Sequence, residues 1–195
     1  MGYSIDPISD GCYEGTTCLI NKFDLKDEQK LMQMETMITT AKCNELELNP
    51  IPGDFGFEHY KLIHKYIFED IYDWAGEIRT VSISKKGTRF TEPESIEYLA
   101  DKIFTSLQKE KCYIGYDDEQ YIDAIVDLYY KTNMLHPFRE GNGRTQRVFL
   151  TQVIRFSGHD INFSNIDTDE LMIATIQSAN GVVDYLRTVL KESIK

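Results

Sequence analysis

The sequence predicts an all-α fold, a helical domain that carries one small β-hairpin. Three observations predict it: apolar residues with helical spacing over most of the 195 residues, one short alternating segment, and a hydrophobic share of 42%. That share is typical of a globular protein with a packed core. A chain of this length can bury one such core. We therefore expect a single domain over residues 1–195, with its core at about 55–160 and accessory segments at both ends.

Seven segments have the spacing of amphipathic helices. In the first, at about 27–45, Leu31, Met34, Ile38 and Ala41 recur three or four residues apart, which predicts that they face the core. A third segment begins at Pro93, a residue suited to a first helical turn. The remaining segments lie at about 57–75, 117–135, 143–157, 168–178 and 181–193.

The hairpin is predicted at about 79–91. Residues Thr80 to Ser84 alternate between polar and apolar, which is the pattern of a strand with one buried face. Lys85 to Thr88 supply turn chemistry, and Arg89 and Phe90 follow. Because an isolated hairpin is marginally stable in water, we expect this one to pack against the helices.

Charge and cysteine usage exclude several classes of partner. The chain has 21 basic and 32 acidic residues, a net charge of −11, which disfavours binding to nucleic acid and to anionic membranes. No apolar run approaches the roughly 20 residues that span a bilayer. The cysteines form no CxxC pair, which indicates reduced thiols and a cytoplasmic location. They are Cys12, Cys18, Cys43 and Cys112.

The segment that indicates chemistry runs from His136 to Arg147 and reads HPFREGNGRTQR. Pro137 disfavours helix at His136, and the next predicted helix begins near Gly143. The unpaired N–H groups at that helix start point into the loop and form an anion site. Arg144 and Arg147 share a helix face and add two positive charges. These features suit a polyphosphate.

A carboxylate and an imidazole accompany this anion site. Glu140 would be repelled by phosphate unless a cation stood between them, and Mg²⁺ prefers a carboxylate combined with phosphate oxygens. His136 can accept a proton near neutral pH. Together they suit phosphoryl or nucleotidyl transfer to a hydroxyl. From the residues alone, a structural histidine, glycine turns and a solvated arginine pair stay open as alternatives. Three other histidines are interpreted as structural: His59, His64 and His159.

The segment from His136 to Arg147 resembles the signature of the Fic family, HxFx(D/E)GNGRxxR, at every specified position. The opening at Tyr13–Thr16 and Leu19–Lys22 is similar to that of the family, as are Tyr66–Phe68 and Ile71–Gly76 before the hairpin. The resemblance implies a Fic-type helical domain with a hairpin flap. It also implies transfer of AMP from ATP to a Tyr, Thr or Ser hydroxyl of a target protein, with release of pyrophosphate and auto-AMPylation as a side activity.

The resemblance also implies a role for each residue that takes part in the chemistry. His136 would deprotonate the attacking hydroxyl, and Glu140 would hold Mg²⁺ against the α- and β-phosphates. Asn142, with the amides of Gly141 and Gly143, would stabilise charge on the α-phosphoryl oxygens.

The two arginines and the flap have roles implied in the same way. Arg144 would hold the β-phosphate and Arg147 the γ-phosphate. The flap would pair with a target segment, with Ile83 and Phe90 as clamps. Family members with Lys at the position of Gly143 can transfer phosphate, so Gly143 favours AMP transfer.

Many family members resemble one another in an inhibitory motif, (S/T)xxxE(G/N), whose Glu pairs with the second motif arginine, here Arg147. Glu192 fits five positions, from Thr188 onward, but Ser193 replaces Gly or Asn. Glu35 has Leu31 in place of Ser or Thr. Both are candidate inhibitory residues. The alternatives are a separate small antitoxin, as in a toxin–antitoxin pair, or no inhibition.

Three other functions stay open at this point. A Fic-type site could transfer UMP or phosphate, or remove AMP from a modified protein. A regulatory protein that binds nucleotide without turnover is the alternative from another class, and an intact His136 and Glu140 argue against it. The target protein and a homo-oligomeric state are not indicated by any residue pattern.

Overall fold

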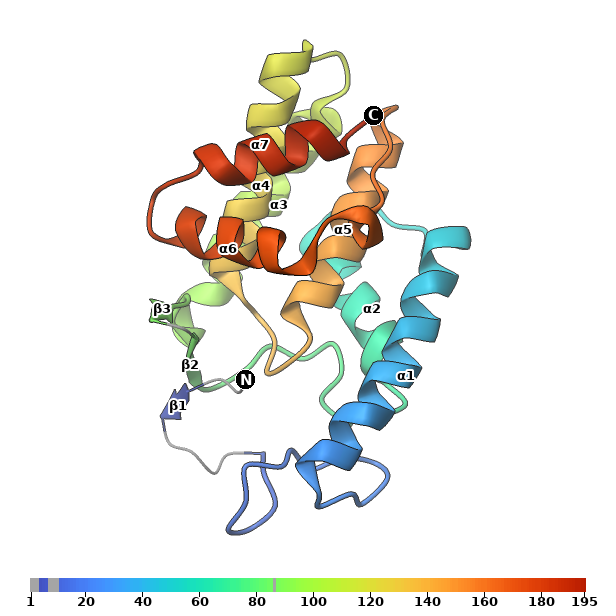
Figure 1. Cartoon of the computed structure of the whole chain (residues 1–195), viewed down its shortest axis with the longest axis vertical. Coiled ribbons are helices and arrows are strands. Elements are labelled where there is room, and N and C mark those ends of the chain that lie inside the picture. Colours follow the sequence, from blue (N-terminus) through green and yellow to red (C-terminus); the bar gives the residue numbers. More distant parts are fainter. Residues whose placement is uncertain (1–3, 7–10, 86) are drawn as a thin grey trace.

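Seven α-helices and a three-stranded sheet make up the part of the chain that the computed structural model describes, residues 4–6, 11–85 and 87–195. The helices are α1 (Glu28–Leu48), α2 (Phe57–Phe68), α3 (Pro93–Lys109), α4 (Asp118–Leu135), α5 (Asn142–Phe156), α6 (Thr168–Ala179) and α7 (Asp184–Ser193). The strands are β1 (Ser4–Asp6), β2 (Ser82–Lys85) and β3 (Thr88–Arg89). The predicted all-α fold with one hairpin is confirmed (Figure 1).

Aspartates cap the starts of three helices. Asp27 and Asp167 each accept hydrogen bonds from two backbone N–H groups, of α1 and α6, and Asp117 accepts one from α4. Such caps satisfy N–H groups that have no acceptor inside the helix. Pro93 lies in the first turn of α3 as predicted. Local sequence signals therefore determine where these helices begin.

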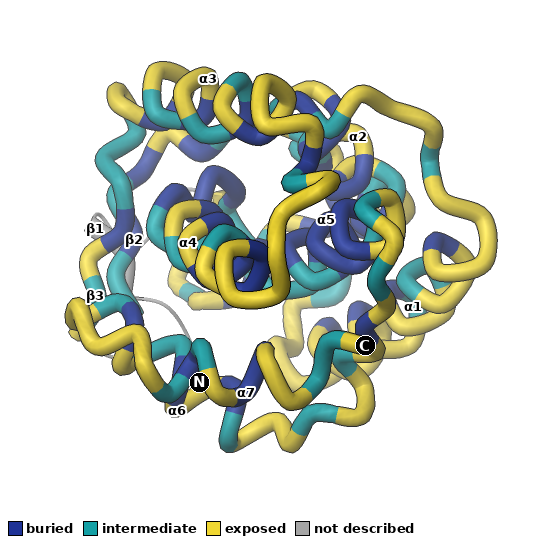
Figure 2. Tube along the Cα trace, turned by 90° about the horizontal axis from the view of Figure 1, so that it is seen from above, coloured by how far each residue is buried: buried dark blue, intermediate teal, exposed yellow. Residues whose placement is uncertain are grey.

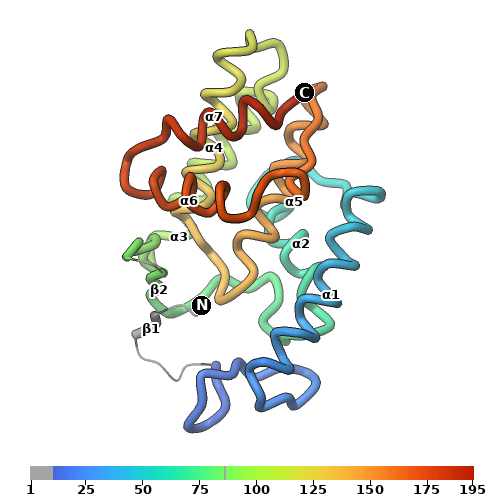
Figure 3. Tube along the Cα trace, in the orientation of Figure 1, coloured from blue at the N-terminus to red at the C-terminus, as the bar shows by residue number. Residues whose placement is uncertain are grey.

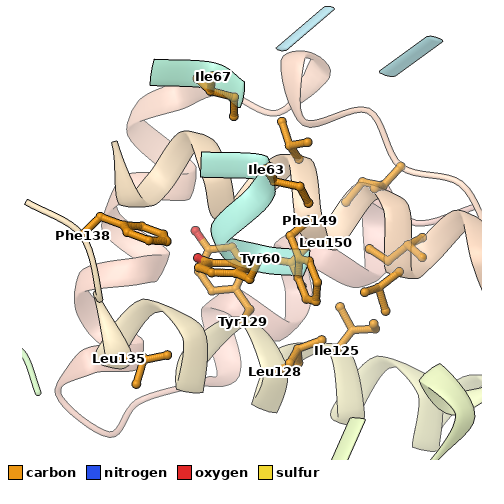
Figure 4. Packing of buried hydrophobic residues seen from close by; sticks show 14 of the residues in the cluster. Tyr60, Ile63, Ile67, Ile125, Leu128, Tyr129, Leu135, Phe138, Phe149 and Leu150 are labelled. Atoms are coloured by element: carbon orange, nitrogen blue, oxygen red, sulfur yellow. The ribbon is translucent and has the colours of Figure 1, made fainter. Parts of the chain in front are cut away.

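The core lies where α2, α4 and α5 meet (Figure 4). Tyr60 of α2 is fully buried, with its ring 5.7 Å from that of Phe138 and 5.1 Å from that of Phe149. Seen from above, α4 and α5 lie in the middle, with α1, α3, α6 and α7 around them (Figure 2). The two central helices are therefore held on all sides by packing.

The second predicted helix is shorter than expected. It was expected to reach residue 75, but α2 ends at Phe68, whose carbonyl accepts from the N–H groups of both Ile71 and Tyr72. The chain turns there, and the ring of Tyr72 stacks on that of Trp74 at 4.4 Å. The apolar spacing continues past α2 because Ile71 and Tyr72 are buried and Trp74 is half-buried. The backbone that carries these side chains is nevertheless a series of turns.

The predicted inner face of the first helix is wrong at two of its four residues, since Leu31 is buried and Ile38 half-buried as expected. Met34 and Ala41 are exposed, whereas Glu35 and Thr39 are buried together with Leu31. The cause is the neighbour: this face of α1 packs against α5 near the start of that helix, where charged groups need polar partners.

The sheet has the order β1-β2-β3, and all pairs are antiparallel. The predicted hairpin is present, and β1 adds a strand that the sequence did not predict, with Ile5 opposite Ile83. Lys86 of the predicted turn lies outside the described residues. The N–H of Thr91 donates to the carbonyl of Met134 at 3.0 Å, so the end of the hairpin is attached to α4 as expected.

The last two helices cover α4 on one side (Figure 1). Leu186, Val189 and Leu190 of α7 are buried. Arg187 pairs with Asp123 at 2.6 Å, an exposed contact that adds little stability. All four cysteines are free thiols. Within the described residues, no helix is both long enough and apolar enough to cross a membrane.

Candidate active site

The chain leaves α4 at His136, runs through residues 136–141, here called the motif loop, and enters α5 at Asn142 (Figure 3). His136 caps α4 in a left-handed conformation with φ of 42°. Asn142 holds the loop from inside: its Oδ1 accepts from the N–H of Phe138 at 2.9 Å, and its Nδ2 donates to the carbonyl of Phe138 at 2.7 Å. The side chain of Asn142 therefore shapes the loop, and its backbone N–H, in the first turn of α5, has no acceptor inside the helix.

A buried histidine of α2 supports the same loop. The N–H of Gly76 donates to Nδ1 of His64 at 2.8 Å, so the ring proton lies on Nε2, which donates to the carbonyl of Glu140 at 3.0 Å. The ring of Phe138 stacks on His64 at 3.7 Å. Burial lowers the pKa of His64 to about 3, so the ring is neutral. The structural role predicted for His64 is thus observed.

His136 is held in one orientation. Its Nδ1 lies 3.2 Å from the carbonyl of Asn133, so Nδ1 carries the proton and the lone pair is on Nε2. Its ring stacks on Phe90 at 3.7 Å. Burial lowers the pKa of His136 to about 3, and the charges of Arg79 and Lys85 act in the same direction. At neutral pH the imidazole is therefore unprotonated and can accept a proton.

Arg79 connects this histidine to the hairpin. Its Nε donates to the carbonyl of His136 at 2.8 Å and its Nη1 to that of Val81 at 2.5 Å. Its own N–H donates to the carbonyl of Pro137 at 2.9 Å. The sequence alone did not indicate a role for Arg79. Arg79 is the first residue of the predicted hairpin, and no pattern in the sequence shows that its side chain is buried.

The first motif arginine is surrounded by partners. Nη2 of Arg144 lies 2.6 Å from Oε1 of Glu35 and 3.5 Å from Oε1 of Glu140. Its Nη1 donates to Oγ1 of Thr39 at 3.1 Å. Its guanidinium lies over the ring of Phe68 at 4.8 Å. The head group is therefore fixed from α1, α2 and α5.

Arg147, the second motif arginine, differs from Arg144 in its surroundings. Within the described part of the chain, no side chain forms an ion pair or hydrogen bond with Arg147. Burial lowers the pKa of its guanidinium, and the nearby charge of Arg144 acts in the same direction. A half-buried cation without a counter-ion favours an anionic ligand.

The start of α5 adds backbone donors to these charges. Gly141 caps the helix with φ of 79°, and no side chain caps it. The first hydrogen bond of the helix is from the N–H of Thr145 to the carbonyl of Gly141, so earlier N–H groups lack helical acceptors. A Cβ added at Gly143 would lie 3.3 Å from Nη1 of Arg147, so the glycine keeps this region open. The arrangement is an anion site.

A cavity of about 560 Å³ opens beside this anion site. His136, Gly143, Arg144 and Arg147 line it. Other lining residues come from α1, the hairpin, α4 and α6, among them Thr39, Cys43, Phe90, Tyr129, Met172 and Ile176. The volume lies within the range of sites that bind nucleotide-sized ligands.

Glu140 is not among the residues that line the cavity. Its Oε1 accepts from the N–H of Gly141 at 2.8 Å. Among the described residues, no group of three or more His, Cys, Asp or Glu side chains could hold a metal ion. A single carboxylate combined with phosphate oxygens and water fits the coordination that Mg²⁺ adopts with nucleotides.

The residues expected to clamp a target are buried. Ile83 and Phe90 form a small cluster with Val81, and the N–H of Phe90 donates to the carbonyl of Ile83 at 3.2 Å. The other edge of β2 pairs with β1. The hairpin therefore presents an apolar core beside His136, and its outer edge is occupied by the chain itself.

The two candidate inhibitory residues lie in different places. Glu35 is at the site, but it pairs with Arg144 and not with Arg147, the arginine that the family resemblance specifies. Glu192 is exposed on α7 and does not line the cavity. The structure therefore brings only Glu35 to the motif.

The fit around Gly141 generates a stability prediction. A Cβ at Gly141 would lie 2.1 Å from the ring of Phe68, and its φ of 79° disfavours any side chain. We expect Gly141→Ala to lower the free energy of unfolding by about 2–4 kcal/mol, measured by urea denaturation. Gly143→Ala is the matched control, because its added Cβ meets only a flexible side chain. Equal stability of the two variants would contradict the packing argument.

The buried neutral histidines generate a pH prediction. The pKa values of His64 and His136 are lowered from 6.5 to about 3, so only the unfolded chain takes up these protons between those pH values. Stability is therefore full above pH 6.5 and is lost as the pH falls below it. We expect the free energy of unfolding to fall by about 2.5 kcal/mol between pH 7 and pH 5.5. His136→Ala should show about half of this decrease, and a pH-independent stability would refute the argument.

Comparisons with known proteins identify the family of this chain. The family model of the Fic/DOC family matches residues 54–154. Protein adenylyltransferase VbhT of Bartonella schoenbuchensis is 33% identical over 98% of this chain, which spans 39% of VbhT. The Sinorhizobium fredii protein y4lH, named a probable protein adenylyltransferase, is 32% identical over 97% of this chain and 96% of its own length. The fold is similar to the N-terminal Fic domain of a Bep effector protein from Bartonella quintana with bound ADP, with a TM-score of 0.89, 23% identity and coverage of 95% and 94% of the two chains. The chain belongs to the Fic/DOC family.

Proposed function

We propose that this chain is a protein adenylyltransferase that transfers AMP from ATP to a Tyr, Thr or Ser hydroxyl of a protein and releases pyrophosphate. The observation that carries the proposal is a neutral His136 that lines the same cavity as Arg147, a cation without a counter-ion among the described residues. The names of VbhT and y4lH support the reaction type. This chain spans only 39% of VbhT. The proposal therefore concerns the activity of this chain and takes nothing from the rest of VbhT.

His136 acts as the general base in this proposal. The carbonyl of Asn133 orients the ring, and Nε2 takes the proton of the attacking hydroxyl as the new bond to the α-phosphorus forms. Oriented proton acceptors contribute because they need no reorganisation during the reaction. A bound polyphosphate raises the pKa of His136 from its low value, since opposite charge favours the imidazolium.

The arginines and the start of α5 bind the phosphates. Arg147 takes the outermost phosphate, and Arg144, already fixed, takes the one before it. The N–H groups of Asn142 and Gly143 stabilise charge that develops at the α-phosphoryl group. The family resemblance implies AMP transfer rather than phosphate transfer where Gly143 stands in place of Lys, and a Cβ at this position would lie 3.3 Å from Nη1 of Arg147.

Glu140 is the residue that would hold Mg²⁺. The ion would neutralise phosphate charge when it is bound with the nucleotide. The N–H of Gly141 donates to Oε1 of Glu140 at 2.8 Å, so the carboxylate has a fixed direction before any ion binds.

The hairpin is proposed to bind the target. An added segment would pair with the backbone of β2, as in strand addition to a sheet edge. Because β1 already occupies that edge, a target has to displace residues 4–6 or extend the sheet elsewhere. Ile83 and Phe90 would then support the flap from inside and would not grip the target directly.

Restraint of the enzyme is proposed to come from a separate small protein. Inside the described residues, no carboxylate reaches Arg147, so a partner can place one there. This is the arrangement of a toxin with its antitoxin, acting in the cytoplasm.

The proposal is tested by incubating the protein with ATP and Mg²⁺ and measuring the intact mass of the protein and of added acceptor proteins. We expect a mass gain of one AMP moiety. His136→Ala should lower the rate of transfer by about 10²–10⁴-fold, because it loses the general base. His159→Ala, which removes a histidine stacked on Tyr121, is the matched control and should transfer at the rate of the parent.

The other outcomes identify the alternatives. A gain of phosphate, or of UMP when UTP is supplied, would replace AMP transfer with another group transfer. Loss of mass from a previously modified protein would indicate AMP removal. Nucleotide binding with no mass change in any of these mixtures would contradict the enzyme assignment.

A further inference from the structure

The buried face of α1 carries a carboxylate at the phosphate site. Glu35 is only 9% exposed, and both of its oxygens have partners. Oε1 accepts from Nη2 of Arg144 at 2.6 Å, and Oε2 accepts from the hydroxyl of Tyr72. Burial raises the pKa of Tyr72, and the carboxylate of Glu35 raises it further, so the phenol remains a donor. The carboxylate is therefore held at both ends.

A threonine one turn further along α1 completes the arrangement. Oγ1 of Thr39 donates its proton to the carbonyl of Glu35 at 2.8 Å, which leaves its lone pairs toward Nη1 of Arg144 at 3.1 Å. The ring of Phe68 covers one face of the guanidinium. Glu35 and Thr39 of α1 thus fix Nη2 and Nη1 of Arg144, and the ring of Phe68 fixes the plane of the guanidinium.

We propose that Glu35 is a positioning residue that holds Arg144 ready for phosphate and keeps it away from Glu140. This inference rests on the proposed function. Nη2 of Arg144 is shared unequally, at 2.6 Å from Glu35 and 3.5 Å from Glu140. Without Glu35, the same nitrogen is drawn to Glu140, four residues earlier in the chain. The carboxylate proposed to hold Mg²⁺ would then be occupied by Arg144.

The position of Glu35 relative to the cavity separates this role from a blocking role. Arg144 and Thr39 line the cavity, whereas Glu35 does not. Glu35 therefore contacts Arg144 on the side away from the cavity and occupies no space that a nucleotide needs. Its hydrogen bond from Tyr72 holds the carboxylate away from Arg147. A carboxylate placed there orients a cation and does not compete with the ligand.

Positioning and blocking predict opposite signs. Glu35→Gln removes one negative charge beside a phosphate site, so electrostatics alone would strengthen nucleotide binding. Release of a blocking group would act in the same direction. Positioning predicts the reverse, since Arg144 loses its fixed orientation and Glu140 loses its availability.

The experiment measures ADP binding by calorimetry, with and without Mg²⁺, and AMP transfer, for the parent and Glu35→Gln. We expect Mg²⁺ to strengthen ADP binding to the parent and to have a much smaller effect on Glu35→Gln. Affinity with Mg²⁺ should fall roughly tenfold, about the contribution of one hydrogen bond to a charged group. The rate of AMP transfer should fall at least as much, and the Mg²⁺ concentration for half-maximal rate should rise.

Two further variants keep the test decisive. Tyr72→Phe removes the donor that fixes the carboxylate and should show the same changes to a smaller extent. Glu45→Gln, an exposed change on the same helix, should behave as the parent. If Glu35→Gln does not fold, as judged by circular dichroism and thermal unfolding, the effect of Mg²⁺ on ADP binding by Tyr72→Phe decides the role of Glu35.

Unchanged or stronger ADP binding by Glu35→Gln with a normal Mg²⁺ effect would overturn the inference, as would faster AMP transfer. A parent protein that binds ADP but transfers no AMP would sink the proposed function alone. The comparison of ADP binding with and without Mg²⁺ would still decide the role of Glu35.

Discussion

His64 bridges two distant segments, because it accepts a hydrogen bond from the N–H of Gly76 and donates one to the carbonyl of Glu140. The motif loop depends on this bridge. A charged imidazole could not accept from Gly76, so the bridge exists only while the ring is neutral. Burial among Phe68, Phe138 and Trp74 keeps it neutral. The apolar core therefore sets the position of the loop through the protonation state of one side chain.

The same burial that shapes the loop also prepares its chemistry. His136 stays unprotonated because it is covered by Phe90, and Phe90 belongs to the hairpin cluster. The backbone of His136 is in the left-handed region, which is strained for a residue with a side chain. Arg79 stabilises that conformation by donating to the carbonyl of His136. The hydrogen bond from Arg79, at the start of the hairpin, thus offsets the backbone strain at His136, the proposed general base. The hairpin therefore supports the site even before any target binds.

Much of this could be predicted from the sequence, because its signals are local. The helix starts follow from aspartate caps and Pro93, and the loop from Pro137 and its glycines. The end of α2 and the strand β1 could not be predicted, since stacking of Tyr72 on Trp74 and pairing of Ile5 with Ile83 join residues through tertiary contacts. The motif residues were identified by their pattern, whereas the partners that orient them come from distant segments.

The inner face of α1 shows why such partners are missed. Apolar spacing assigns the inner face to Met34 and Ala41, but a helix that packs against a phosphate site must bury polar groups there instead. Glu35 and Thr39, one turn apart, follow the period of a buried stripe as closely as apolar residues would. A buried acidic residue such as Glu35 cannot be interpreted until the cation that pairs with it is known. That cation is Arg144, and Glu35 pairs with it from a position that does not line the cavity. The structure therefore favours a supporting role for Glu35 over an inhibitory one.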